Sequence, residues 1–72
     1  MLVIYSKENC QQCDTAKLLC QVKGWEFETK LLNLTYTRED LLNIAPHAKS
    51  FPVIFYGDKL VGGLTELKTL LK

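Results

Sequence analysis

The sequence predicts a single α/β domain in which a mixed four-stranded sheet carries helices on both faces, in the order βαβαββα. Three observations predict it. An apolar, β-favouring segment opens the chain at residues 2–6, and a stretch with helical periodicity follows over 11–23. Two further β-favouring segments, at 53–56 and 59–61, flank a turn pair and so form a hairpin. The 72 residues leave room for one domain only, spanning 1–72.

The first half of the chain predicts a strand, a helix and a second strand. Residues 2–6 are largely apolar and β-favouring, which is typical of a fully buried strand. Residues 11–23 place apolar side chains along one helical stripe, and Gly24 is suited to end that helix. Residues 25–33 alternate in part between apolar and charged positions, which favours a half-exposed strand near a sheet edge. The intervening helix supplies the crossover that parallel pairing requires.

The second half predicts a short helix, a hairpin and a last helix. Thr37 followed by Asp40 is a capping-box pattern, so we expect a helix over 38–45 that stops before Pro46. After the hairpin, Gly62-Gly63 is expected to open a helix whose leucines fall on one face. This element order is the thioredoxin-like arrangement.

Composition and charge exclude several classes of function. The net charge is +1, from nine basic and eight acidic side chains, so no basic field is available to hold nucleic acid. The apolar start at 1–5 is too short for a membrane span or a signal-peptide core. We therefore expect a cytoplasmic protein without membrane attachment, functioning as a monomer. Three cysteines are few for a disulfide scaffold and favour redox chemistry or metal binding.

The motif that carries chemistry is Cys10-Gln11-Gln12-Cys13, which follows the first strand and opens the first helix. Backbone N–H groups in the first turn of a helix lack helical partners and favour an anion. A thiol there has a pKa below the ~8.5 of free cysteine, and the thiolate is the attacking species. We expect Cys10 to be the nucleophile and Cys13 the resolving thiol. Lys7 would add positive charge near the thiolate; an ordinary solvated lysine is the alternative.

Metal binding is the main alternative for the cysteine pair. A zinc site needs about four ligands, and only Cys20 and His47 remain to complete one. Cys20 lies two helical turns beyond Cys13, ~10 Å along the axis, which is too far for a compact site. The sequence therefore predicts no metal site. Cys20 is expected to be a buried core thiol, with a regulatory, glutathionylated cysteine as the alternative.

Four motifs, in order and at matching spacing, resemble the glutaredoxin family. The segment 6–13 resembles its S-K-x-x-C-x-x-C pattern, and Ala16-Lys17 stand where the family commonly has Ala-Lys. Phe51-Pro52-Val53 resembles its Thr-Val-Pro segment, and Gly62-Gly63 resembles its glycine pair. The chain is similar to the short viral and bacterial members, which often serve ribonucleotide reductase.

The resemblance implies a role for each segment. Pro52 would be cis, leaving the backbone of Phe51 free to pair with a substrate backbone; a trans proline opening a strand is the alternative. Glutathione would be the co-substrate, with no permanently bound cofactor. Lys7 would face its glycyl carboxylate, with Arg38 either assisting or merely solvated. Its γ-glutamyl carboxylate would lie at the start of the last helix, against Gly62, Gly63, Leu64 and Thr65.

Three departures from the family pattern affect these expectations. Gln11-Gln12 replace the common Pro-Tyr, which should change the redox poise. Thr65 stands where many members have aspartate, which should weaken a contact to the glutathione amine. Phe51 replaces a smaller valine, which should reshape the groove.

The resemblance implies a glutathione-dependent thiol–disulfide oxidoreductase that reduces protein disulfides or glutathione mixed disulfides, with ribonucleotide reductase among the expected partners. Two alternatives remain open. A related redoxin that tolerates Gln in its CxxC motif takes electrons from thioredoxin reductase, but it ends in Trp-Ser-Gly-Phe-Arg-Pro where this chain has residues 61–66. Some glutaredoxins instead share an iron–sulfur cluster between two chains, with the first cysteine and glutathione as ligands.

Overall fold

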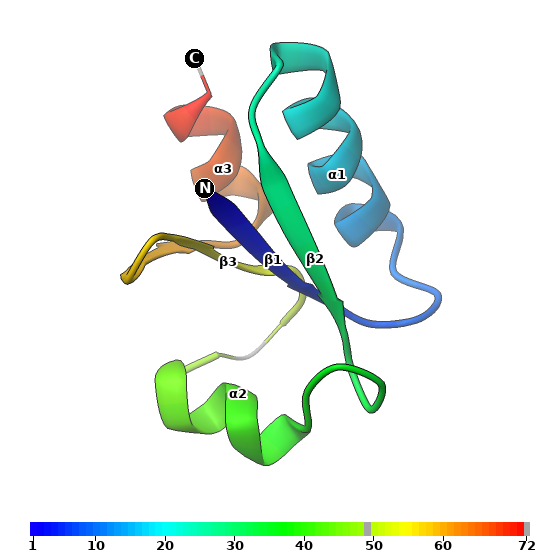
Figure 1. The fold of residues 1–72 in the computed structure, drawn as a ribbon, viewed down its shortest axis with the longest axis vertical. Coiled ribbons are helices and arrows are strands. Elements are labelled where there is room, and N and C mark those ends of the chain that lie inside the picture. The colour runs from blue at the N-terminus through cyan, green and yellow to red at the C-terminus, as the bar shows by residue number, and fades with distance from the viewer. Residues whose placement is uncertain (49, 72) are drawn as a thin grey trace.

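The structure, a computed structural model, describes residues 1–48 and 50–71 (Figure 1). Its elements along the chain are β1 (Leu2–Ser6), α1 (Gln11–Lys23), β2 (Phe27–Leu31), α2 (Arg38–Ile44), β3 (Val53–Tyr56), β4 (Lys59–Gly62) and α3 (Leu64–Leu70). The predicted α/β fold with the order βαβαββα is confirmed.

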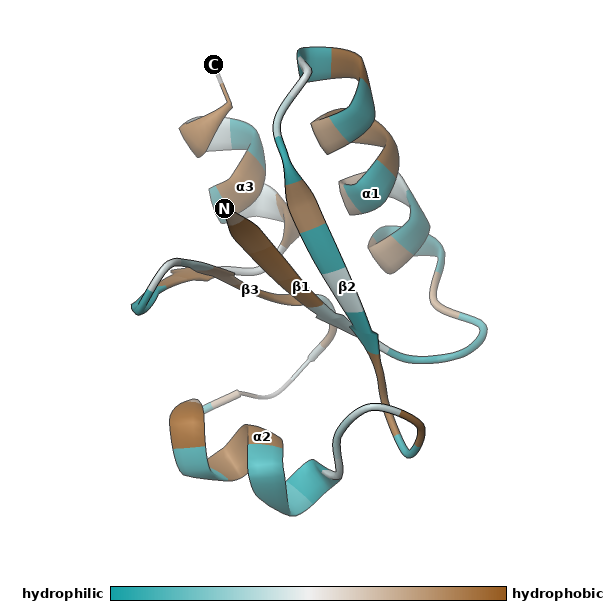
Figure 2. Cartoon of the chain, viewed as in Figure 1, coloured by the Kyte–Doolittle hydropathy of each residue, from teal (hydrophilic) through white to brown (hydrophobic). Residues whose placement is uncertain are grey.

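The four strands form one mixed sheet in the order β2-β1-β3-β4. β1 pairs in parallel with β2, with Leu2 opposite Phe27, and antiparallel with β3, with Tyr5 opposite Val53. β4 adds an antiparallel edge beside β3. The inner position of β1 explains its strongly hydrophobic sequence (Figure 2), because both of its faces are covered. β2 is an edge strand, as predicted.

The helices cover both faces of the sheet, with α1 and α3 on one side and α2 on the other (Figure 1). The core under α1 and α3 consists of fully or almost fully buried side chains: Leu2, Ile4, Ala16, Cys20, Ile54, Leu67 and Leu71. The core under α2 is smaller and partly aromatic: Tyr36, Leu41, Ala45, Val53 and Phe55. Each face of β1 and β3 is therefore buried by a different set of helices.

The helix ends have local causes that the sequence partly predicts. α1 ends at Gly24, whose φ of 73° is left-handed and whose N–H donates to the carbonyls of Cys20 and Gln21. α2 begins with the predicted capping box: Thr37 N–H donates to Asp40 Oδ2 at 3.0 Å, and Asp40 N–H donates to Thr37 Oγ1 at 3.2 Å.

Two predicted boundaries are too wide. α2 stops at Ile44 rather than at Ala45, because Ala45, which precedes Pro46, has left the helical backbone with φ −141° and ψ 74°. The strand predicted over 25–33 is limited to 27–31, the length over which it pairs with β1.

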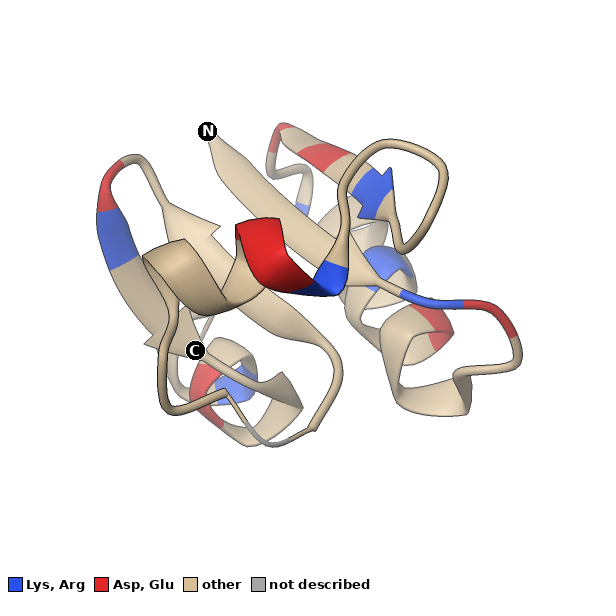
Figure 3. Cartoon of the chain, turned by 90° about the horizontal axis from the view of Figure 1, so that it is seen from below, with Lys and Arg blue, Asp and Glu red and all other residues tan. Residues whose placement is uncertain are grey.

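Basic and acidic residues, nine and eight in number, are interspersed along the chain (Figure 3). Two ion pairs, Asp14–Lys17 at 3.7 Å and Glu28–Lys30 at 3.6 Å, are solvent-accessible. Pairs of this kind stabilise a fold by only ~0–1 kcal/mol. Within residues 1–48 and 50–71, no helix has the length and apolar character needed to cross a membrane.

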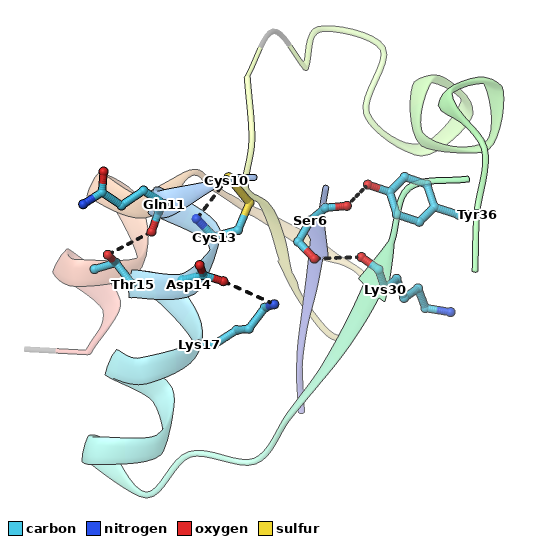
Figure 4. Close-up of a disulfide and its surroundings, with 9 residues drawn as sticks. All are labelled: Ser6, Cys10, Gln11, Cys13, Asp14, Thr15, Lys17, Lys30 and Tyr36. Atoms are coloured by element: carbon cyan, nitrogen blue, oxygen red, sulfur yellow. Dashed lines mark hydrogen bonds and ion pairs between the residues drawn. A yellow bond between two sulfur atoms is a disulfide. The ribbon is translucent and has the colours of Figure 1, made fainter. Parts of the chain in front are cut away.

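Buried hydrogen bonds fix the end of β1 (Figure 4). The Tyr36 hydroxyl donates to the Ser6 carbonyl at 2.8 Å. The Leu32 N–H donates to the same oxygen at 2.9 Å. The Ser6 hydroxyl donates to the Lys30 carbonyl at 3.1 Å. Burial, with a smaller effect of nearby Tyr5, raises the pKa of Tyr36 to about 12, so the phenol keeps its donor proton at neutral pH. The strand is therefore held firmly just before the segment that leads to the cysteines.

Replacing Leu67 with alanine should lower the free energy of unfolding by about 2–4 kcal/mol, because it leaves a cavity in the core. Leu67 is 0% exposed, whereas Leu18 on α1 is 59% exposed and provides a matched control. Leu18→Ala should change the free energy of unfolding by less than about 0.5 kcal/mol. Urea unfolding followed by circular dichroism measures both. Equal losses would contradict the assignment of the core.

Cys20 should be chemically silent in the folded, reduced protein. It is 0% exposed, and burial raises the pKa of its thiol above the ordinary value. At neutral pH it therefore stays protonated and out of reach. Brief treatment with iodoacetamide should modify Cys10 and spare Cys20 until the chain is unfolded in urea, as peptide mapping by mass spectrometry would record. Native-state modification of Cys20 at the rate of Cys10 would refute its placement.

Candidate active site

The cysteine segment, the proline segment and the start of α3 meet at one end of the sheet. The antiparallel register that sets Tyr5 opposite Val53 makes the residues after β1 emerge beside the residues before β3. A Cβ added to Gly63 would lie 3.5 Å from the carbonyl oxygen of Pro52, so the start of α3 adjoins the proline. Segments far apart in the sequence thus form one site.

Cys10 is the N-cap of α1 and Cys13 lies in its first turn (Figure 4). The sulfur of Cys10 accepts a hydrogen bond from the Cys13 N–H, with an N···S distance of 3.1 Å. The Cα atoms lie 5.2 Å apart, and the two sulfurs are joined in a disulfide. When the pair is reduced, the same N–H and the positive end of the α1 dipole stabilise a thiolate on Cys10.

The two cysteines differ in exposure in a way that fits different roles. Cys10 is half-buried at the rim of the site, whereas Cys13 is only 1% exposed. Cys10 is therefore the more accessible sulfur of the pair, and Cys13 is shielded from solvent in the first turn of α1. Gln11 and Gln12 between them are exposed.

Asn9 is a site residue that the sequence analysis missed. Its φ of 55° lies in the left-handed region, and this turn directs the chain from the loop after β1 into Cys10. Asparagine adopts such a conformation several times more often than most residues. An asparagine directly before the first cysteine was the available signal.

Lys7, Phe51 and Arg38 come together beside the cysteine pair. The Phe51–Pro52 peptide bond is cis, which confirms the prediction. The Lys7 Nζ lies 5.5 Å from the centroid of the Phe51 ring, a cation–π arrangement. Lys7, Arg38 and Phe51 border one open cavity of about 490 Å³. Lys7, predicted to face a carboxylate, thus borders the same cavity as Arg38, for which either assistance or simple solvation was expected.

The start of α3 differs from the prediction. Gly62 ends β4, and Gly63 alone is the N-cap of a helix that begins at Leu64. The Gly63 N–H donates to Glu66 Oε1 at 2.7 Å. Glu66 was missed, although glutamate three residues after an N-cap is a known capping pattern. Gly62 has a φ of 125°, and a Cβ there would lie 2.7 Å from Glu66 Cγ, so this position requires glycine.

The remaining candidate residues fall into two groups. Leu64 is half-buried and Thr65 exposed in the first turn of α3, where backbone N–H groups have no helical acceptor. His47 is exposed in the loop after α2, and Cys20 lies in the core. Over the part of the chain that the structure describes, no three His, Cys, Asp or Glu side chains gather to hold a metal ion.

Comparison with known protein sequences gives a consistent result. The family model described as Glutaredoxin matches residues 2–61. The glutaredoxin-like protein NrdH of Salmonella typhimurium is 33% identical over 57 residues, which cover 79% of this chain and 69% of that protein.

Solved structures agree with this match. The buckwheat glutaredoxin–glutathione complex superimposes with a TM-score of 0.79 at 26% identity, covering 94% of this chain and 64% of that one. The solution structure of glutaredoxin from Brucella melitensis superimposes with a TM-score of 0.76 at 32% identity. The match covers 96% of this chain and 75% of that one. With its cysteine pair at the start of α1 and a family match over most of its length, the chain belongs to the glutaredoxin family of thiol–disulfide oxidoreductases.

Proposed function

We propose that this chain reduces protein disulfides and glutathione mixed disulfides, and that glutathione restores its dithiol. The observation that carries the proposal is the Cys10–Cys13 pair at the start of α1, in a chain that also offers two sets of groups suited to anions. Lys7 and Arg38 form one set, and the N–H groups at the start of α3 form the other. Glutathione has a carboxylate at each end, so its two ends match the two sets.

The reaction is a pair of thiol–disulfide exchanges. The Cys10 thiolate attacks one sulfur of the substrate disulfide, and the other sulfur leaves as a thiolate that takes up a proton. Cys13 then loses its proton to solvent and attacks the Cys10 sulfur, which releases the second substrate sulfur as a thiol. Two electrons pass to the substrate and the cysteine pair becomes a disulfide. Two glutathione molecules reverse these steps at the pair and leave as glutathione disulfide.

Glutathione would bind with its glycyl carboxylate toward Lys7 and Arg38 and its γ-glutamyl end toward α3. At that end its carboxylate would meet the N–H groups of Leu64 and Thr65, and the Glu66 carboxylate would accept from its ammonium group. In this orientation Glu66 offsets the missing aspartate at position 65. A buckwheat glutaredoxin of similar fold forms a complex with glutathione, which supports the choice of co-substrate.

We further propose that the chain functions as a cytoplasmic monomer and that ribonucleotide reductase is a protein substrate. The support for this partner is the resemblance to short viral and bacterial glutaredoxins. Reduction of ribonucleotides oxidises a cysteine pair on that enzyme, and a dithiol donor must reduce the pair again. The Cys10–Cys13 dithiol can do this without a bound cofactor.

A second candidate reductant is thioredoxin reductase. Gln11-Gln12 in place of Pro-Tyr favours it, because the related redoxin that tolerates Gln in its CxxC motif takes electrons from that enzyme. The Glu66 carboxylate also accepts the hydrogen bond of the Gly63 N–H, which leaves one donor fewer for the carboxylate of glutathione.

Mutation should separate the roles of the two active-site cysteines. Cys10→Ser should lower reduction of a glutathione mixed disulfide by at least ~10³-fold, because it removes the nucleophile. Cys13→Ser should retain that activity and lose reduction of protein disulfides, which needs the resolving thiol. Glutathione-coupled NADPH oxidation and insulin turbidity measure the two reactions. Cys20→Ala is the matched control and should retain both; full activity of Cys10→Ser would disprove the assignment.

The natural reductant can be identified by recharging the oxidised protein in two separate reactions. Glutathione with glutathione reductase should restore two thiols per chain, counted by thiol titration. Thioredoxin reductase with NADPH should recharge the chain far more slowly. If only thioredoxin reductase restored the thiols, glutathione would be excluded as the reductant and the second candidate would stand.

A further inference from the structure

The open cavity beside the cysteine pair has an apolar floor that glutathione does not need. It measures about 490 Å³ and lies between the loop after β1, the start of α2 and the residue before Pro52. Its apolar lining comprises Leu32, Leu41, Leu42, Ala48 and Phe51. Leu41 is 4% exposed and forms the base, whereas Leu42 is 39% exposed at the rim. The cavity therefore offers an accessible apolar surface that includes Phe51, the residue before the cis proline.

Among the residues that the structure describes, Lys7 and Arg38 are the charged residues that line this cavity, and no carboxylate does. Lys7 and Arg38 both contribute to its wall. The acidic residues nearest in sequence, Glu8, Glu39 and Asp40, do not, and the Asp40 carboxylate is already bound to the Thr37 N–H. Within residues 1–48 and 50–71, neither Lys7 nor Arg38 forms an ion pair. The wall thus favours an anionic group that approaches together with an apolar one.

Glutathione satisfies only part of this surface. In the proposed orientation its glycyl carboxylate faces Lys7 and Arg38, but glycine has no side chain to cover the leucines. A peptide that carries a large apolar residue directly after its cysteine would cover them, and an acidic residue next in the chain would reach the cations. Filling an apolar pocket in this way discriminates between substrates by about 10-fold or more.

We propose that the cavity selects protein substrates in which the reactive cysteine is followed by an apolar residue and then an acidic one. This specificity rests on the proposed function, because it uses the same groove and the same nucleophile. The Cys10 thiolate attacks the peptide cysteine sulfur and expels its former partner as a thiol. Cys13 then displaces the peptide, which leaves reduced while the cysteine pair becomes a disulfide.

Three tripeptides test the proposal: Cys-Leu-Glu, Cys-Gly-Glu and Cys-Leu-Gln, each amidated at its C-terminus and carrying cysteamine on its cysteine as a disulfide. The full chain is reduced beforehand with dithiothreitol and freed of it, and single-turnover rate constants are measured. Dividing each by the rate of uncatalysed reduction by dithiothreitol removes differences in intrinsic reactivity. Cys-Leu-Glu should react at least ~10-fold faster than Cys-Gly-Glu, and severalfold faster than Cys-Leu-Gln.

Variants of the chain test whether the cavity causes the preference for leucine and the preference for glutamate. Leu42→Ser should reduce the preference for leucine over glycine, and Arg38→Gln should reduce the preference for glutamate over glutamine. Leu18→Ser and Lys23→Gln, both on α1 away from the cavity, are the matched controls and should leave both preferences intact. Equal rates for the three peptides, or equal effects of the cavity and control variants, would overturn the proposal.

Measuring both reactions on the same protein samples distinguishes failure of the cavity proposal from failure of the proposed function. The peptide assay starts from protein that is already reduced, so it does not require glutathione as reductant. Peptide selectivity without glutathione-coupled turnover would refute the proposed reductant alone. Glutathione-coupled turnover without peptide selectivity would refute the cavity proposal alone.

Discussion

The hydrogen bond from the Cys13 N–H to the Cys10 sulfur is the interaction on which the active site depends. It exists because α1 begins at Gln11, where the first N–H groups have no helical acceptors. Cys10 itself holds the N-cap position, which Ser, Thr, Asp or Asn usually fill. The bond is strongest when the sulfur is negatively charged, so the helix start stabilises the thiolate relative to the disulfide. Stabilising the reduced form in this way makes a dithiol protein a better oxidant.

The sheet supplies the fixed frame that this interaction needs. Ser6 ends β1 and is anchored on two sides, by Tyr36 and by β2, so the short loop to Cys10 starts from a rigid point. The antiparallel register of β1 with β3 then brings Phe51 and Pro52 to the same end of the sheet. The short loops at this end can vary in chemistry, because their ends are held by strands buried on both faces.

The fold was largely predictable because local signals agree with the tertiary structure. The helix over 11–23 has a clear start at the cysteine segment and a clear stop at Gly24, and both are as predicted. Gly62 was misplaced because a glycine pair before a leucine-rich segment resembles a helix opening, whereas its strand pairing with Ile54 depends on a distant segment. The cysteine pair was visible in the sequence as a motif. The cavity was not, since four separate segments line it, and only the packing of α2 brings Leu42 near Phe51.

The burial of Cys20 determines whether this third cysteine takes part in disulfide exchange when the protein is oxidised repeatedly. Three cysteines allow three internal pairings, but Cys20 faces the core between α1 and the sheet, while Cys10 faces outward. A mixed disulfide on Cys10 can therefore be resolved only by Cys13 or by an external thiol. The packed core thus acts as a barrier to disulfide scrambling, and each catalytic cycle returns the chain to the same covalent isomer.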